Sequence, residues 1–345
     1  MRRLMFLLSG EHPSLPAAEV FGAIEAEHRV YKVDEELDQV LILETKADPQ
    51  ILAKRLAMTQ WIGEHICTAL VSEVPDAVGS SDLVDIIPHG KSFAVRVKRV
   101  KRYSPEIDVG ELARKIADLI RSEVDFKVDL SSPDVEMLAV LTGDKCAVGI
   151  KEASIDTSQF RRREPKHRAV FHPGTIKPKL ARCMVNLART PRGGVVLDPF
   201  VGVGGILLEA GLIGARAVGV DIDPKSLEGA EKNLKQFGVK DYELLLGDAR
   251  QLELEEEVDA IATDPPYGRQ VSTRGLELPR IYEQALPSLV RALKPGRHMC
   301  ITSPSGIALE DFAEDVGFKL VEKHSQRVHK SLVRNIYVLR KKRFL

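Results

Sequence analysis

The chain has 345 residues, of which 44% are hydrophobic and 29% are charged, a composition typical of a globular protein with two or three domains. Lys and Arg together number 50, as do Asp and Glu, so net charge favours no partner and any surface for nucleic acid must be local. No apolar run approaches the roughly 18 residues of a membrane span, and the four cysteines and nine histidines lack metal-ligand spacing, so we expect a cytoplasmic protein without membrane or metal partners.

The first 152 residues alternate short strands and helices. Residues 1–55 are predicted to form an N-terminal ferredoxin-like α+β domain, with strands and helices at Leu4–Ser9, Pro16–Glu27, Arg29–Val33, Gln39–Glu44 and from Pro49. Residues 56–152 are predicted to form a second α+β domain, with elements at Phe93–Val100, Glu111–Ser122, Lys127–Leu130, Glu136–Thr142 and Ala147–Ile150. The order of elements in this second domain resembles the THUMP domain of RNA-modifying enzymes.

Positive charge is concentrated in three short stretches. Five cations lie in seven residues from Arg96 to Arg102, five lie in eight residues from Arg161 to Arg168, and residues 340–343 form a basic tail. The second stretch falls in residues 153–170, which are predicted to be a basic linker. A cluster of charged residues is often only a solvent-exposed surface. In a chain with a THUMP-like domain, such a cluster of cations indicates contacts with RNA phosphates. The residues expected to bind RNA are Arg96, Lys98, Arg99, Arg161, Arg162 and Arg163.

Residues 171–345 alternate strands and helices as a doubly wound α/β sheet does. Four of the predicted strands are each followed or ended by an acid: Asp198, Asp221, Asp248 and Asp264. Because parallel strands end at the same edge of a sheet, these acids are predicted to line one ligand crevice. Two later segments, at 319–322 and 335–339, are predicted to close the sheet as an antiparallel pair.

The first of these strands leads into a glycine-rich loop that contains Gly202, Gly204 and Gly205. Glycines allow close approach to a ligand, and the following helix offers free N–H groups. The spacing matches a dinucleotide-binding loop imperfectly, and Asp198 would repel a pyrophosphate but suits a sulfonium cation and its ammonium group. A nicotinamide enzyme is the alternative from the loop alone. Asp221, at the next strand end, suits a ribose with two hydroxyls.

The fourth strand leads into Asp264, Pro265, Pro266, Tyr267 and Gly268. Two prolines end the strand and leave carbonyls without competing N–H donors. A carboxylate, these carbonyls and an aromatic ring together suit a flat ring with an exocyclic amine, held by stacking and by hydrogen bonds from its N–H groups. A proline turn with Tyr267 covering the core is the alternative.

This segment resembles the Asp-Pro-Pro-Tyr signature of S-adenosylmethionine-dependent enzymes that methylate exocyclic amines of bases, and the acids resemble class I (Rossmann-like) methyltransferases. With residues 172–175 and 178–188, the whole chain resembles the archaeal tRNA guanosine-10 N2-methyltransferases. The resemblance implies Asp264 as the catalytic residue and Pro265, Pro266 and Tyr267 against the substrate base. It implies a cofactor site made of Thr175, Asp198, Phe200, Gly202, Gly204, Asp221, Ile222, Asp248 and Ala249.

The resulting hypothesis is methyl transfer from S-adenosylmethionine to N2 of guanosine in tRNA, at position 10, once or twice. The Asp-Pro-Pro-Tyr segment also occurs in enzymes that methylate N6 of adenine, so the assignment of guanine as the target base rests on the family resemblance. Another tRNA position, ribosomal RNA, DNA adenine and a non-catalytic RNA-binding scaffold are the alternatives. We expect tRNA as the partner and a monomer, and a requirement for a small activator subunit is left open.

Overall fold

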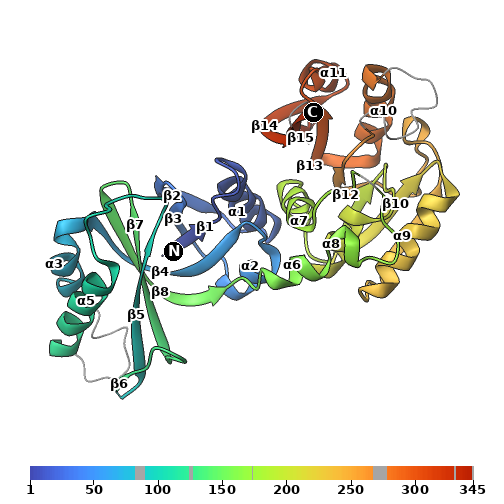
Figure 1. The fold of residues 1–345 in the computed structure, drawn as a ribbon. Coiled ribbons are helices and arrows are strands. Elements are labelled where there is room, and N and C mark those ends of the chain that lie inside the picture. The colour runs from blue at the N-terminus through green and yellow to red at the C-terminus, as the bar shows by residue number, and fades with distance from the viewer. Residues whose placement is uncertain (82–89, 124–126, 173, 267–277, 330–331, 344–345) are drawn as a thin grey trace. The chain divides into compact units, whose positions relative to one another are not determined.

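The computed structural model describes residues 1–81, 90–123, 127–172, 174–266, 278–329 and 332–343 (Figure 1). The chain packs into two compact units, the first made of residues 1–11, 29–53 and 59–155 and the second of residues 12–28, 54–58 and 156–345. Packing therefore divides the chain differently from the four consecutive domains expected at 1–55, 56–152, 153–170 and 171–345, because residues 12–28 and 54–58 belong with the second unit.

The first unit contains one eight-stranded sheet with the strand order β2-β3-β1-β4-β8-β7-β5-β6. Its strands are β1 (Arg2–Leu8), β2 (Tyr31–Leu37), β3 (Val40–Thr45), β4 (Thr59–Leu70), β5 (Ser92–Arg99), β6 (Lys127–Val128), β7 (Val135–Thr142) and β8 (Lys145–Ser154). Strand β5 runs parallel to β6 and β7, and the other neighbours are antiparallel. A single sheet thus joins strands from both predicted N-terminal domains.

The helices of the first unit are α2 (Pro49–Arg55), whose last two residues count with the second unit, α3 (Val74–Gly79) and α5 (Val109–Glu123). Helix α5 buries Leu112, Ile116 and Ile120, which recur every four residues and so share one face. This face packs with Phe93 of β5 and Met137 of β7. Because side chains alternate along a strand, β5 buries Phe93 and Val95 and leaves Arg96 and Lys98 exposed.

The second unit contains a seven-stranded sheet with the order β11-β10-β9-β12-β13-β15-β14. Its strands are β9 (Val195–Asp198), β10 (Arg216–Asp221), β11 (Tyr242–Leu246), β12 (Val258–Thr263), β13 (Leu293–Pro304), β14 (Phe318–His329) and β15 (Leu332–Lys341). The first five strands in this order are parallel, and β15 and β14 close the sheet antiparallel. The Rossmann-like sheet and its closing pair are confirmed.

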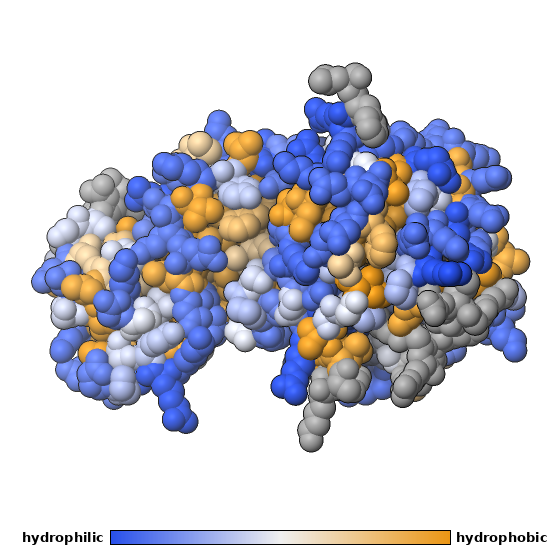
Figure 2. Space-filling model, turned by 90° about the horizontal axis from the view of Figure 1, so that it is seen from above, coloured by the Kyte–Doolittle hydropathy of each residue, from blue (hydrophilic) through white to orange (hydrophobic). Residues whose placement is uncertain are grey.

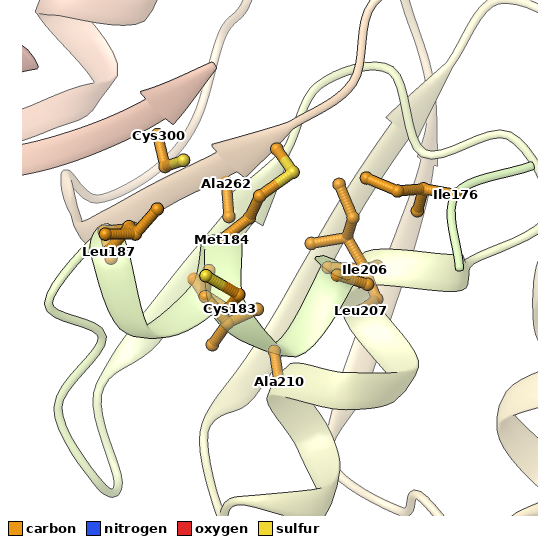
Figure 3. Packing of buried hydrophobic residues seen from close by; sticks show 14 of the residues in the cluster. Ile176, Cys183, Met184, Leu187, Ile206, Leu207, Ala210, Ala262 and Cys300 are labelled. Atoms are coloured by element: carbon orange, nitrogen blue, oxygen red, sulfur yellow. The ribbon is translucent and has the colours of Figure 1, made fainter. Parts of the chain in front are cut away.

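Helices cover both faces of this sheet: α1 (Leu15–Ala26), α6 (Ser158–Arg162), α7 (Pro178–Leu187), α8 (Gly205–Leu212), α9 (Pro224–Gln236), α10 (Leu278–Ala292) and α11 (Leu309–Asp315). Two hydrophobic clusters result, one around α7 and α8 and one around α10 and α11. Figure 3 shows Met184 of α7 packed among Ile206 and Leu207 of α8 and Ala262 of β12. Helix α7 is therefore a core element that sets the position of α8 and of the loop before it.

A buried carboxylate fastens α1 to the second unit. Glu19 accepts hydrogen bonds from the N–H groups of Ala57 and Met58 and, at 3.0 Å, from the amide of Asn186 in α7. Burial raises the pKa of Glu19 to about 7, although these donors oppose the shift. The Arg55 guanidinium completes the group by donating to the same asparagine. These contacts explain why residues far apart in sequence form one unit.

The end of the predicted linker is also part of the second unit. Arg163 is only 7% exposed and pairs with Glu209 of α8 at 2.8 Å, and Arg168 is 6% exposed. The N–H of Val170 donates to Asn233 of α9, whose amide donates back to the carbonyl of Val170. The prediction that Arg163 is an RNA-binding cation is therefore wrong, because its guanidinium is buried in an ion pair. Arg161 and Arg162 are exposed.

Within the part of the chain that the structure describes, no helix is long and apolar enough to cross a membrane. Figure 2 shows hydrophilic residues over most of the face that it presents, with hydrophobic residues scattered between them.

Candidate active site

The four strand-end acids lie in one row along the carboxyl edge of the second sheet. The strand order β11-β10-β9-β12 places them as Asp248, Asp221, Asp198 and Asp264. Strand β9 has β10 on one side and β12 on the other, so the chain changes direction across the sheet at β9. Open α/β sheets bind ligands outside the carboxyl ends at such a switch point. The four acids thus follow adjacent strands.

Asp198 is the most deeply buried of these acids, with 2% of its surface exposed. Its Oδ1 accepts a 2.7 Å hydrogen bond from the Thr263 hydroxyl and a 3.2 Å bond from the N–H of Phe200. Burial raises the pKa of Asp198 to about 7, and the nearby carboxylates of Asp264 and Asp221 add to that shift. Thr263 lies directly before Asp264 in the chain, so this hydrogen bond ties the end of β12 to Asp198.

Asp221 holds the glycine-rich loop. Its Oδ2 accepts the N–H of Gly202 at 2.9 Å, and its Oδ1 accepts the N–H of Asp223 at 2.9 Å. Burial raises the pKa of Asp221, an effect that these donors oppose. Gly202 and Gly204 have φ values of 49° and 80°, a conformation that favours glycine. The acid therefore shapes the loop and keeps lone pairs on both oxygens, and Ile222 beside it is 39% exposed.

Asp248 follows β11 and caps the short 3₁₀ turn at Ala249–Gln251 by accepting the N–H of Arg250. The Arg250 guanidinium also holds both carboxylate oxygens, at 2.9 and 2.5 Å. Ala249 is buried in the core, 4% exposed, so its methyl group packs inward. Arg250 was not anticipated from the sequence, although a basic residue two positions after an acid at a strand end is a detectable signal.

Asp264 is held by two residues from neighbouring strands. The Thr302 hydroxyl of β13 donates to its Oδ1 at 2.5 Å, and the Arg334 guanidinium of β15 lies 3.7 Å from its Oδ2. Pro265 is buried and Pro266 half-buried, while Tyr267 lies outside the described residues. Sequence reasoning missed Thr302 and Arg334. The sequence does not show which strand lies beside β12, and the partner of the Thr302 hydroxyl depends on that neighbour.

Thr175 and Phe200 flank the glycine-rich loop. The Thr175 hydroxyl donates to the carbonyl of His172 at 2.7 Å. A Cβ built on Gly205 would lie 3.6 Å from the Thr175 methyl group and 3.0 Å from Nη1 of Arg168, so both side chains reach the start of α8. Phe200 packs partly against the hydrophobic cluster around α10. The structure therefore places Thr175 and Arg168 at the start of α8, beside the loop.

The cations expected to bind RNA differ in exposure. Arg96 is exposed, with its guanidinium 3.2 Å from Glu136 and donating to the carbonyl of Leu130 at 2.8 Å. Lys98 is exposed and donates to the Gln60 side chain. Arg99 is half-buried and donates to the carbonyl of Ile107. Arg96 and Lys98 are thus surface cations, whereas Arg99 supports the loop after β5.

Two family models match the chain, the THUMP domain over residues 71–151 and the RMKL-like methyltransferase domain over residues 165–336. The chain is 38% identical to the tRNA (guanine(10)-N2)-dimethyltransferase of Methanothermobacter thermautotrophicus, with 97% of this chain and 98% of that protein covered. The protein of the same name from Pyrococcus abyssi is 34% identical, with 95% and 96% covered. The chain belongs to this family. The crystal structure of TrmN from Thermus thermophilus shares its fold over 98% of this chain and 99% of that one, with a TM-score of 0.53 and 21% identity.

As a member of this family, the chain is an S-adenosylmethionine-dependent tRNA methyltransferase. Its residues fit that cofactor: a buried acid at the loop suits the cationic methionine end, a second acid suits a ribose, and two glycines with positive φ open the backbone. Among the residues described, no cluster of three metal-ligating side chains occurs.

Proposed function

We propose that this chain transfers two methyl groups from S-adenosylmethionine to N2 of guanosine 10 in tRNA. The position and the number of methyl groups follow the relatives that match nearly the whole chain, which are tRNA (guanine(10)-N2)-dimethyltransferases. The observation that carries the chemistry is the placement of Asp264 beside the cofactor crevice, next to Asp198 and held by Thr302 and Arg334.

The exocyclic amine of guanine is a weak nucleophile because its lone pair is delocalised into the ring. A carboxylate that accepts one N–H and a carbonyl that accepts the other favour a pyramidal nitrogen with its lone pair available. We assign these roles to Asp264 and to the carbonyl of Pro265, with Tyr267 stacking on a base turned out of its helix. S-adenosylmethionine supplies an already activated methyl group, so positioning accounts for much of the acceleration.

The contacts to Asp264 fit this role. Thr302 and Arg334 hold the carboxylate in one orientation. The negative charge of Asp264 then stabilises the positive charge that develops on the amine during methyl transfer. The same carboxylate accepts or relays the proton that the nitrogen loses. Since the first transfer leaves one N–H on N2, the same carboxylate serves the second transfer.

Placement of the tRNA is assigned to cations outside the crevice. Arg96 and Lys98 project from one face of β5, beside a shallow groove lined by Lys98, Arg99 and residues 105–109. Arg161 and Arg162 are exposed on α6. A base pocket alone does not select one guanosine among many, so phosphate contacts at these cations position the substrate. We also propose that the chain acts as a monomer in the cytoplasm.

The proposal is tested with tRNA transcripts that differ at one position. Inosine is guanosine without its N2 amine, so a transcript with inosine at position 10 should bind like the parent and accept no methyl group. The assay uses this single purified chain, which also tests whether an activator subunit is needed. Unchanged methylation of the inosine transcript would place the target elsewhere, and methylation of a transcript with adenosine at position 10 would favour N6 chemistry.

A further inference from the structure

Arg168 is a buried cation without a counter-ion in the part of the chain that the structure describes. The residue is 6% exposed, and its Nε donates to the carbonyl of Arg163 at 2.9 Å. Its Nη1 and Nη2 have no hydrogen-bond partner among the described residues. Buried guanidinium groups are normally paired, because the loss of hydration is costly. Among the described residues, Arg168 therefore has no anion bound to its Nη atoms.

The carboxylate whose charge acts on Arg168, that of Glu209, already has other partners. Glu209 of α8 is fully buried and accepts from Arg163 at 2.8 and 3.0 Å, and its Oε2 also lies 2.8 Å from Nη2 of Arg182. Two guanidinium groups thus share one carboxylate before Arg168 is counted. The region carries an excess of positive charge that a ligand with one negative group would balance.

The unpaired end of Arg168 lies at the start of α8. A Cβ on Gly205, the first residue of that helix, would stand 3.0 Å from Nη1 of Arg168 and 3.6–3.7 Å from side-chain carbons of Thr175 and Ile176. The first N–H groups of a helix have no partner within it and attract anions. Two kinds of donor therefore converge beside the glycine-rich loop of the cofactor crevice.

We infer that Arg168 and the first turn of α8 form the subsite for the α-carboxylate of the methionine part of S-adenosylmethionine. The planar guanidinium offers two parallel donors to one carboxylate. The same end of the cofactor carries an ammonium and a sulfonium group, for which Asp198 supplies the negative charge. Arg168 and Asp198 would then bind the two opposite charges of one amino-acid group. A tRNA phosphate is a poorer candidate, because the side chain is buried in the second unit.

The inference rests on S-adenosylmethionine being the cofactor and is independent of which base is methylated. The test is calorimetric binding of two probes, S-adenosylmethionine and decarboxylated S-adenosylmethionine, to the full chain. Wild type should prefer the carboxylated probe. In Arg168→Met its affinity should fall about 10- to 100-fold, as for lost hydrogen bonds to a charged group. The affinity for the decarboxylated probe should change less than about threefold, so the preference disappears.

Two further variants separate this role from a structural one. Gly205→Ala places a methyl group at Nη1 of Arg168 and should reduce the same preference without removing a charge. If Arg168→Met does not fold, the Gly205→Ala variant tests the inference in its place. Arg216→Met changes an exposed arginine at the start of β10, at the opposite edge of the sheet, and should leave both affinities unchanged. Equal losses for both probes, a retained preference in Gly205→Ala, or weaker tRNA binding alone would overturn the inference. Failure of wild type to bind either probe would instead overturn the proposed function.

Discussion

The strand-end acids and the cations of residues 161–168 are equally conspicuous in the sequence, yet the structure treats them differently. All four acids lie at one edge of one sheet. Of the cations, Arg161 and Arg162 are exposed, whereas Arg163 and Arg168 are buried. An acid at the end of a parallel strand is placed by the strand itself. A cation in a charge run is placed by partners elsewhere, here Glu209, which is 46 residues from Arg163.

The largest expected effect is on the acid assigned to the chemistry. Asp264→Ala should lower the rate of methyl transfer by about 10²- to 10³-fold, corresponding to about 3–4 kcal/mol, because the lost interaction acts mainly in the transition state. Cofactor affinity, measured by calorimetry, should stay within a few fold. Asp241→Asn changes an exposed acid before β11, at the opposite edge, and should leave the rate unchanged. Near wild-type turnover in Asp264→Ala would remove this residue from the mechanism.

The buried cations should matter for stability. Arg163→Met leaves Glu209 with one guanidinium partner in place of two and should cost about 3 kcal/mol of unfolding free energy, measured by denaturant titration. Arg162→Met is the matched control, because Arg162 is exposed and pairs with the exposed Asp156, and its unfolding midpoint should not move. Equal midpoints for the two variants would show that their difference in burial has no energetic consequence.

The raised pKa of Asp198, about 7, predicts how cofactor binding depends on pH. Below pH 7 the acid is protonated and neutral, so it attracts the cationic methionine end less. Affinity for S-adenosylmethionine should therefore fall about tenfold from pH 8 to pH 6, since the ionised fraction falls by that factor. The Asp198→Asn variant should bind more weakly at pH 8 and lose this slope. The same slope in the variant would assign the titration to another group.

The smallest effect is expected for the exposed cations of β5. Lys98→Glu should weaken tRNA binding several-fold and reduce the salt dependence by about one unit of slope. Lys115→Glu is the control, because Lys115 is exposed on α5 and pairs with Glu111. Cofactor affinity should be unchanged in both. Identical salt dependence for the two variants would mean that β5 does not contact phosphate.

Much of the fold and the row of acids could be predicted from the sequence, because short apolar runs, glycines and prolines act locally. The Rossmann-like sheet and its closing pair followed from such signals. The partners of the acids could not be predicted in the same way. Thr302 and Arg334 meet Asp264 only because β13 lies beside β12 and β15 beside β13. Residues 12–28 join the second unit through buried polar contacts at Glu19, and no local pattern reveals such pairing.

The most direct test of the proposed function is to identify the product of the single purified chain. Unmodified tRNA transcript is incubated with S-adenosylmethionine and the chain, digested with a nuclease, and mapped by mass spectrometry. We expect N2,N2-dimethylguanosine at position 10 with the wild-type chain and no methylated nucleotide with Asp264→Ala. Methylation of an adenine or of another guanosine, or the absence of any methylated nucleotide, would contradict the proposed function.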